Sequence, residues 1–224
     1  MIRNALIMAA GRGTRMAPLT DDIPKPMAPF AGTTLIARGL DHLRTHVECI
    51  YVTVGYKKAM LAHHVIEHGA TGVFNTEGKG NAWWIYRTLL SKLNEPVLVL
   101  TADNVIDLDL DLIEADYNAL GRPPCMLVPV KPVEGLEGDY IFHTGGLVTA
   151  LSRQDAADVY CSGIQVLNPF SVIAATEPTD DFNVVWSQLI MTKNLMMSSV
   201  YPKRWFSVDT VEQLGRLESI FANN

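Results

Sequence analysis

The residues near the start of the chain combine glycines with basic side chains, and this combination is suited to binding phosphate. The run Ala9-Ala10-Gly11-Arg12-Gly13-Thr14-Arg15 directly follows the apolar stretch Ala5–Met8. The glycines permit a sharp turn whose backbone N–H groups point at an anion. Arg15 offers a planar fork of donors to phosphate oxygens, and Lys25 adds a movable point charge. The segment therefore predicts a triphosphate-binding loop behind a buried strand.

The spacing in this loop differs from that of two common phosphate loops. No lysine follows Gly13, as a Walker loop would need, and Met16 stands where a dinucleotide fingerprint needs a third glycine. An isolated Gly-x-Gly would indicate an ordinary turn. The continuation Thr14-Arg15-x-x-Pro18-Leu19-Thr20, followed by Pro24-Lys25-Pro26, makes the signal specific. With it, the loop resembles the signature of nucleotidyltransferases that activate sugar 1-phosphates and related phosphate monoesters.

The resemblance implies an α/β, Rossmann-like nucleotidyltransferase fold. Its central sheet would be mixed but mostly parallel, with helices on both faces and a small antiparallel extension. We expect residues 1–224 to form a single nucleotidyltransferase domain, with a nucleotide-binding half at about 1–120 and an acceptor-binding half at about 121–224. Within the superfamily, the chain resembles N-acetylmuramate 1-phosphate uridylyltransferases and shares some features with phosphocholine cytidylyltransferases.

The sequence pattern supports the same class of fold. Apolar runs alternate with helical patterns through the first half of the chain, which favours parallel strands covered by helices. The second half has shorter runs around turn residues, which favours antiparallel pairing. The expected strands are 5–8, 50–54, 72–74, 97–100, 125–128, 140–142, 147–150 and 160–167, and the expected helices are 35–44, 57–67, 81–92 and 211–220.

Two aspartates are candidate ligands for Mg²⁺. Asp103 follows the most apolar strand, and ligands of open α/β sheets lie beyond the carboxyl ends of the strands. Position therefore favours a metal ligand over a helix cap for Asp103. The resemblance implies a second metal aspartate near Asp209. Asp209 could instead be the N-cap of the helix that begins near Val211, and the sequence leaves both interpretations open.

The resemblance also implies contacts with the nucleotide and the acceptor. The segment Glu77–Ala82 is similar to a family segment that contacts the nucleobase, although Asn81 could simply cap the next helix. Gly135–Tyr140 and Ser162–Val166 are similar to the acceptor segments, although Asp139 could be an exposed turn residue. The implied nucleotide-binding residues are Ala10, Gly11, Gly13, Thr14, Arg15, Lys25, Asn75, Gly80, Asn81 and Asp103, and the implied acceptor-binding residues are Asn104, Gly138, Asp139 and Gly163.

Composition limits the classes of partner. The net charge of −6 argues against general nucleic-acid binding, and no stretch approaches the roughly 20 apolar residues that cross a bilayer. Cys49, Cys125 and Cys161 are odd in number and lack metal-ligand spacing, as expected of reduced thiols in the cytoplasm. The sequence does not indicate an oligomeric state.

We therefore expect a Mg²⁺-dependent transfer of a nucleoside monophosphate from a nucleoside triphosphate to a sugar 1-phosphate, with release of pyrophosphate. Arg15, Lys25 and Asp103 are the expected catalytic residues, and Asp103 and Asp209 the expected metal ligands. UTP or CTP is the favoured donor, and the product would be a nucleotide sugar for cell wall or surface polysaccharide. Two alternatives stay open: a cytidylyltransferase acting on phosphocholine or another small phosphate or phosphonate, and an inactive nucleotide-binding regulatory module.

Overall fold

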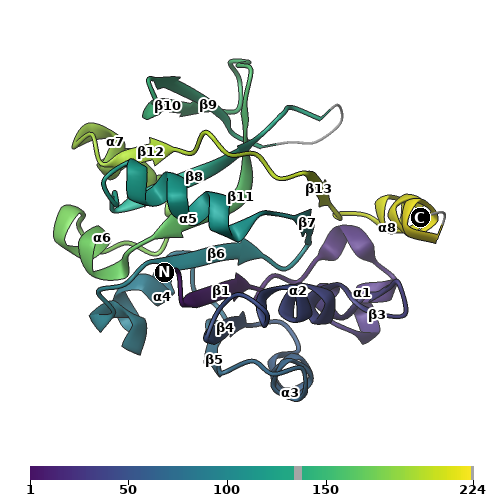
Figure 1. Ribbon diagram of the computed structural model, residues 1–224. Helices are drawn as coiled ribbons and strands as arrows, with labels where there is room; N and C mark the ends of the chain where they lie inside the picture. The colour runs from purple at the N-terminus through teal and green to yellow at the C-terminus, as the bar shows by residue number, and fades with distance from the viewer. Residues whose placement is uncertain (134–137, 223–224) are drawn as a thin grey trace. The chain divides into compact units, whose positions relative to one another are not determined.

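The chain folds into two units, each assembled from separated segments. The computed structural model describes residues 1–133 and 138–222 (Figure 1). Of the expected acceptor segment, Gly135–Glu137 lie outside the described residues. The first unit comprises Met1–Arg3, Lys79–Val99 and Leu108–Lys203, and the second comprises Asn4–Gly78, Leu100–Asp107 and the chain from Arg204 onward.

The second unit is built on three parallel strands in the order β5-β4-β1. The first four residues of β1 are buried, and after Asn4 the strand is entirely apolar, as expected of a strand covered on both faces. Helix α2 begins where the Thr34 hydroxyl accepts a hydrogen bond from Ala37 N at 3.2 Å, and one face of the helix is buried. The elements of this unit are β1 (Asn4–Met8), η1 (Thr14–Met16), α1 (Leu19–Asp22), η2 (Lys25–Met27), β2 (Pro29–Phe30), β3 (Thr33–Thr34), α2 (Leu35–Leu43), β4 (Cys49–Val54), α3 (Lys58–Glu67), β5 (Gly72–Asn75), β7 (Asn104–Asp107), β13 (Arg204–Ser207) and α8 (Val211–Ala222).

The first unit contains mixed strands in the order β6-β11-β8-β12-β10-β9. Strand β11 is antiparallel to both β6 and β8, whereas β12 is parallel to β8. Helices α6 and α7 pack against each other, and α7 also contacts β10 and β12. The elements are α4 (Trp83–Arg87), η3 (Leu89–Lys92), β6 (Val97–Thr101, whose last two residues belong to the second unit), α5 (Leu110–Ala119), β8 (Cys125–Val130), β9 (Tyr140–Thr144), β10 (Leu147–Ser152), β11 (Tyr160–Leu167), α6 (Pro169–Ala175), α7 (Phe182–Met191) and β12 (Leu195–Met197).

The α/β class with mixed strands is confirmed, and every strand expected from the sequence is present. Antiparallel pairing extends beyond the small extension that we expected, because β11 lies between β6 and β8 and is antiparallel to both. The helix expected over residues 81–92 is interrupted. It forms α4 and then η3, because Thr88 adopts an extended conformation and its hydroxyl accepts from Leu90 N at 3.3 Å.

Several short elements were not expected, including β7, β12 and β13, which have three or four residues each. Such runs are too short to show a period. Helices α6 and α7 were also missed, although each begins with a side-chain cap, from Asn168 and Asp181 respectively. No helix in the described part of the chain is long and apolar enough to cross a bilayer.

Candidate active site

The glycine-rich loop between β1 and α1 turns at Gly13. This residue has φ of +67°, in the left-handed region that favours glycine. A Cβ at this position would lie 2.5 Å from Cβ of Lys25, so glycine is also needed for the close approach of the lysine stem. Gly11 and Thr14 are exposed, and a Cβ at Gly11 would meet nothing within 4 Å. The loop therefore presents an open backbone edge beside the stem of Lys25.

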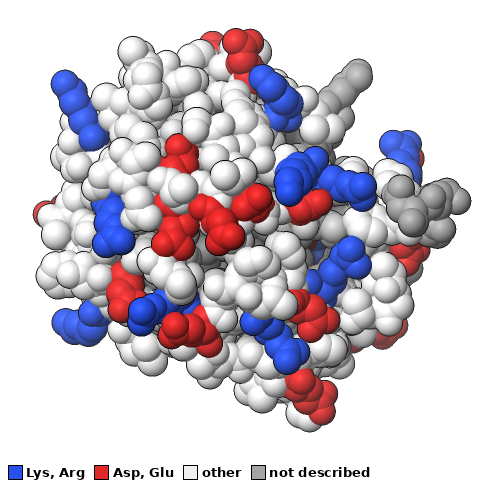
Figure 2. All heavy atoms as spheres, viewed as in Figure 1, with Lys and Arg blue, Asp and Glu red and all other residues white. Residues whose placement is uncertain are grey.

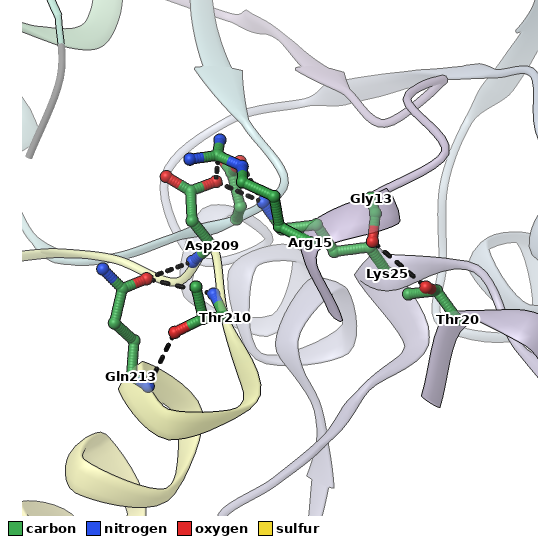
Figure 3. Close-up of polar contacts among 8 residues, drawn as sticks. Gly13, Arg15, Thr20, Lys25, Asp209, Thr210 and Gln213 are labelled. Carbon is green, nitrogen blue, oxygen red and sulfur yellow. Dashed lines mark hydrogen bonds and ion pairs between the residues drawn. The ribbon is translucent and has the colours of Figure 1, made fainter. Parts of the chain in front are cut away.

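Tyr56, two residues after the end of β4, supports this loop through hydrogen bonds. Its N–H donates to the Ala10 carbonyl at 3.1 Å, and its hydroxyl donates to the Thr20 carbonyl at 2.9 Å. The Thr20 hydroxyl in turn donates to the Gly13 carbonyl at 3.1 Å (Figure 3). The Arg12 guanidinium lies over the Tyr56 ring, 5.2 Å from its centroid. These contacts fix both ends of the loop, so its N–H groups are positioned before any ligand binds.

Lys25 brings two aspartates together. Its Nζ lies 2.7 Å from Oδ2 of Asp103 and 2.9 Å from Oδ1 of Asp209. Arg15 Nη2 lies 2.9 Å from the same oxygen of Asp209, and Figure 3 shows both cations directed at that carboxylate. The lysine side chain is only 11% exposed, whereas that of Arg15 is 65% exposed. Two positive and two negative groups therefore form one compact cluster, in which Lys25 is the enclosed cation.

A short two-stranded ladder places the two aspartates side by side. Strands β7 and β13 pair antiparallel, with Asn104 opposite Ser207. The Val208 N–H extends the ladder by donating to the Asp103 carbonyl at 2.9 Å. Asp103 immediately precedes β7 and Asp209 follows Val208, so both carboxylates emerge at the same end of this ladder.

The helix-cap interpretation of Asp209 is wrong, because Thr210 caps α8. The Thr210 hydroxyl accepts from Gln213 N at 3.2 Å. The Gln213 side-chain oxygen accepts from Asp209 N at 2.6 Å and from Thr210 N at 3.1 Å (Figure 3). This reciprocal arrangement is a capping box. It leaves the Asp209 carboxylate to face Lys25 and Arg15.

The chemistry of this pair of carboxylates fits a magnesium ion. Mg²⁺ is commonly held by one or two carboxylates together with phosphate oxygens and water. The Asp103 and Asp209 carboxylates converge on a single cation, Lys25, and both are partly exposed, at 29% and 18%. Across residues 1–133 and 138–222, no group of three or more His, Cys, Asp or Glu side chains gathers to hold a metal. Asp103 and Asp209 are therefore the residues that would hold Mg²⁺, with the remaining ligands supplied from outside the chain.

An apolar cluster underlies these charged groups. It joins residues from the loop, from the Pro24–Phe30 segment, from β7 and from α8, so burial of their side chains stabilises the relative positions of these segments. Phe221 packs against this cluster, and its ring contacts the Phe30 ring edge-on, with 5.2 Å between the ring centroids. The buried members of the cluster are Met16, Ala28, Phe30, Leu35, Val105, Val208, Leu214 and Leu217.

Asn104 lines a cavity to which Lys25 does not contribute. The cavity, of about 310 Å³, lies beside α2 and is also lined by Arg38, His42 and apolar side chains. Neither Lys25 nor either aspartate lines this cavity. Asn75, at the end of β5, accepts from Glu77 N at 3.1 Å through its side chain.

In the first unit, Gly80 and Asn81 contact the segment before α7. A Cβ at Gly80 would collide with the Asp180 carbonyl oxygen, and Ala82 N donates to the same oxygen at 3.0 Å. Asn81 does not cap α4. Its side-chain oxygen instead accepts from Phe182 N at 2.9 Å, at the start of α7. These two residues therefore connect α4 with α7.

The expected acceptor residues of the first unit surround β9 and β11. Gly138 lies against the Tyr160 ring, where a Cβ would approach to 2.6 Å. Asp139 accepts from Arg153 Nε at 3.1 Å. Gly163 has φ of +81° at an irregularity in the β11–β8 pairing. Burial raises the pKa of the neighbouring Cys161 thiol to about 12, so this cysteine stays protonated and is unsuited to be a nucleophile.

Sequence reasoning missed two residues that shape the site, Tyr56 and Gln213. Only Gln213 carried a readable signal, because Thr210-x-x-Gln213 before an apolar run has the spacing of a capping box.

On the face shown in Figure 2, lysines and arginines lie interspersed with acidic side chains.

Comparisons with known proteins agree with this fold. The inositol-1-phosphate CTP transferase of T. maritima superposes with a TM-score of 0.81 at 16% identity, over 99% of this chain and 95% of that one. The α/β fold is therefore that of the nucleotidyltransferases.

The sequence defines the family. The MobA-like NTP transferase domain model matches residues 5–181, and the chain belongs to this family.

Curated relatives match shorter regions. "Bifunctional protein GlmU" of Methanococcus maripaludis is 30% identical over 117 residues, which are 52% of this chain and 28% of that protein. The 2-aminoethylphosphonate cytidylyltransferase of Lancefieldella rimae is 34% identical over 141 residues, 62% of this chain and 55% of that protein. The chain thus spans little more than a quarter of the GlmU protein's length.

Proposed function

We propose that this chain transfers a nucleoside monophosphate from a nucleoside triphosphate to a small phosphorylated acceptor and releases pyrophosphate. The observation that supports this most directly is the convergence of Lys25, Asp103 and Asp209 beside the glycine-rich loop. Membership of the NTP transferase family points to the same class of reaction.

In the proposed reaction, an acceptor phosphate oxygen bonds to the α-phosphorus while the bond from that phosphorus to the departing pyrophosphate breaks. The acceptor oxygen is already anionic, so the residues mainly hold negative groups together. The N–H groups of Gly11 and Gly13 and the Arg15 guanidinium would bind the triphosphate. Lys25 would stabilise charge around the α-phosphate. Asp103 and Asp209 would hold Mg²⁺, which supplies charge neutralisation for phosphate oxygens.

We propose a sugar 1-phosphate as the acceptor and UTP or CTP as the donor. The acceptor segments resemble those of N-acetylmuramate 1-phosphate uridylyltransferases, and Gly138, Asp139 and Gly163 fall within them. The inositol-1-phosphate CTP transferase of T. maritima agrees with CTP as the donor and with a sugar-like phosphate as the acceptor.

A second candidate is a cytidylyltransferase for a cationic small phosphate or phosphonate. The relative from Lancefieldella rimae supports it. We further propose that residues 1–224 act as one nucleotidyltransferase domain in the cytoplasm, where the three free cysteines would stay reduced.

A donor-by-acceptor screen with pyrophosphate detection tests the proposal. UTP and CTP are each paired with amino-sugar 1-phosphates, phosphocholine and 2-aminoethylphosphonate, with Mg²⁺ present. One pair should release pyrophosphate, and Asp103→Asn should lower that rate about 10²–10³-fold. Asp107→Asn is the matched control, because Asp107 is an exposed carboxylate at the end of β7, the strand that begins directly after Asp103. Nucleotide binding without pyrophosphate from any pair would indicate the regulatory module instead, and an unchanged rate in Asp103→Asn would remove this residue from the site.

A further inference from the structure

Both cations expected to bind phosphate lie instead on the carboxylates expected to bind metal. Lys25 bridges Asp103 and Asp209, and Arg15 shares the Asp209 oxygen. We infer that Lys25 serves as a resident counter-ion of the two aspartates and is exchanged for the divalent metal when a nucleotide arrives. This inference rests on the proposed function, since it concerns the same site.

The charges of the cluster support an exchange rather than joint occupancy. Two carboxylates face two cations, so the set is already neutral. A divalent ion that entered with Lys25 in place would be repelled by the ammonium. The Asp103 and Asp209 carboxylates that would bind the ion would already be paired with Lys25 and Arg15. Because Lys25 is 11% exposed, water screens this repulsion weakly. Metal alone should therefore bind the ligand-free protein poorly.

The position of the lysine stem shows how the exchange can occur. Gly13 lies directly against Cβ and Cδ of Lys25, so the same side chain borders both the loop and the aspartates. Triphosphate oxygens held by the loop would offer the ammonium another set of anions within a short movement of the side-chain end. Arg15 is 65% exposed and can leave Asp209 readily.

This arrangement makes metal and nucleotide binding mutually reinforcing. The nucleotide draws the cations away from the carboxylates, and the metal then takes their place. Thermodynamic linkage requires that each ligand strengthen binding of the other by the same factor. Lys25 would therefore set the order in which the site fills, with metal entering together with the nucleotide rather than before it.

The test measures Mn²⁺ binding to the full chain without nucleotide, by the electron paramagnetic resonance signal of the free ion. Lys25→Met keeps an unbranched side chain one atom shorter than that of lysine and removes the charge. We expect it to bind Mn²⁺ about 5- to 150-fold more tightly than wild type, the usual range for such couplings. Lys58→Met is the matched control, because Lys58 is an exposed lysine of the same unit, paired with Glu77 at 2.6 Å, and should leave Mn²⁺ affinity unchanged.

Two further variants keep the result interpretable. Lys25→Gln should also tighten Mn²⁺ binding, so a folding defect peculiar to one substitution cannot decide the outcome. Adding Asp103→Asn to Lys25→Met should remove the gain. Equal or weaker binding in both Lys25 variants, or a gain that survives Asp103→Asn, would overturn the exchange.

The two proposals can fail separately. Tighter Mn²⁺ binding in Lys25→Met together with no pyrophosphate release from any substrate pair would support the exchange and refute the transferase. Pyrophosphate release by the wild type with no gain in Mn²⁺ affinity would do the reverse.

Discussion

The two units use their candidate site residues differently. In the second unit, Lys25, Asp103 and Asp209 converge through side-chain charges, while Gly13 shapes the backbone beside them. In the first unit, Gly80 lies against the backbone of Asp180, and Gly138 lies against the Tyr160 ring. One unit thus holds groups suited to reaction chemistry, whereas the expected ligand-contacting glycines of the other are already required by packing.

The largest expected difference concerns catalysis. Lys25→Ala in the second unit should lower turnover about 10²–10³-fold, because it removes a positioned donor from the site of charge development. Arg153→Ala in the first unit removes an ion pair whose arginine side chain is 67% exposed, so its effect on turnover should be much smaller. Steady-state rates of pyrophosphate release, measured at saturating substrates, compare the two variants.

Circular dichroism should show that both variants keep the fold, since without Lys25 the Asp209 carboxylate keeps its ion pair with Arg15 and the Asp103 side chain is 29% exposed. Equal losses of turnover in the two variants would remove the contrast between the units. A loss confined to Arg153→Ala would move the chemistry to the first unit.

A smaller effect is expected for the backbone contact of Gly80. Gly80→Ala would force its Cβ into the Asp180 carbonyl, so we expect a loss of about 1–3 kcal/mol in the free energy of unfolding, as for other overpacked sites. Gly215→Ala is the control, because Gly215 is exposed in α8 with nothing near its Cβ position. That substitution should raise stability by roughly 0.5–1 kcal/mol through helix propensity.

Urea unfolding of both glycine variants gives these values. If Gly80→Ala kept wild-type stability but raised the KM for the nucleotide, Gly80 would be a ligand contact, and the contrast between the units would weaken.

The sequence predicted the part of the site that is formed by residues close together in the chain. The loop around Gly13 could be recognised because its glycines, arginines and spacing lie within a few residues. Lys25 and Asp209, however, are 184 residues apart. The two aspartates that Lys25 contacts are placed side by side by the four-residue strands β7 and β13. Such strands show no usable periodicity, and their pairing depends on burial of the apolar cluster beneath them.

The glycines of the first unit show the opposite limit. The sequence singled out Gly80 as a ligand contact, but glycine is needed there because the Asp180 backbone, a hundred residues away, leaves no room for a Cβ. Similarity to a family motif suggested nucleotide contact, and only the packing reveals a structural reason for the same residue. A glycine in a motif is thus weaker support for binding than a charged side chain with defined partners.

The smallest expected effect tests how the second unit holds Asp209. Thr210→Ala removes the hydroxyl that accepts from Gln213 N, so it should lower the free energy of unfolding by about 1 kcal/mol, the usual cost of losing an N-cap. Thr210→Ser should keep most of the stability, because it retains the hydroxyl. Urea unfolding midpoints measure both. The same capping box holds Asp209 N through Gln213, so Thr210→Ala should also weaken Mn²⁺ binding measured with nucleotide present. If the variant lost stability but kept its Mn²⁺ affinity, the capping box would not position Asp209 for the metal.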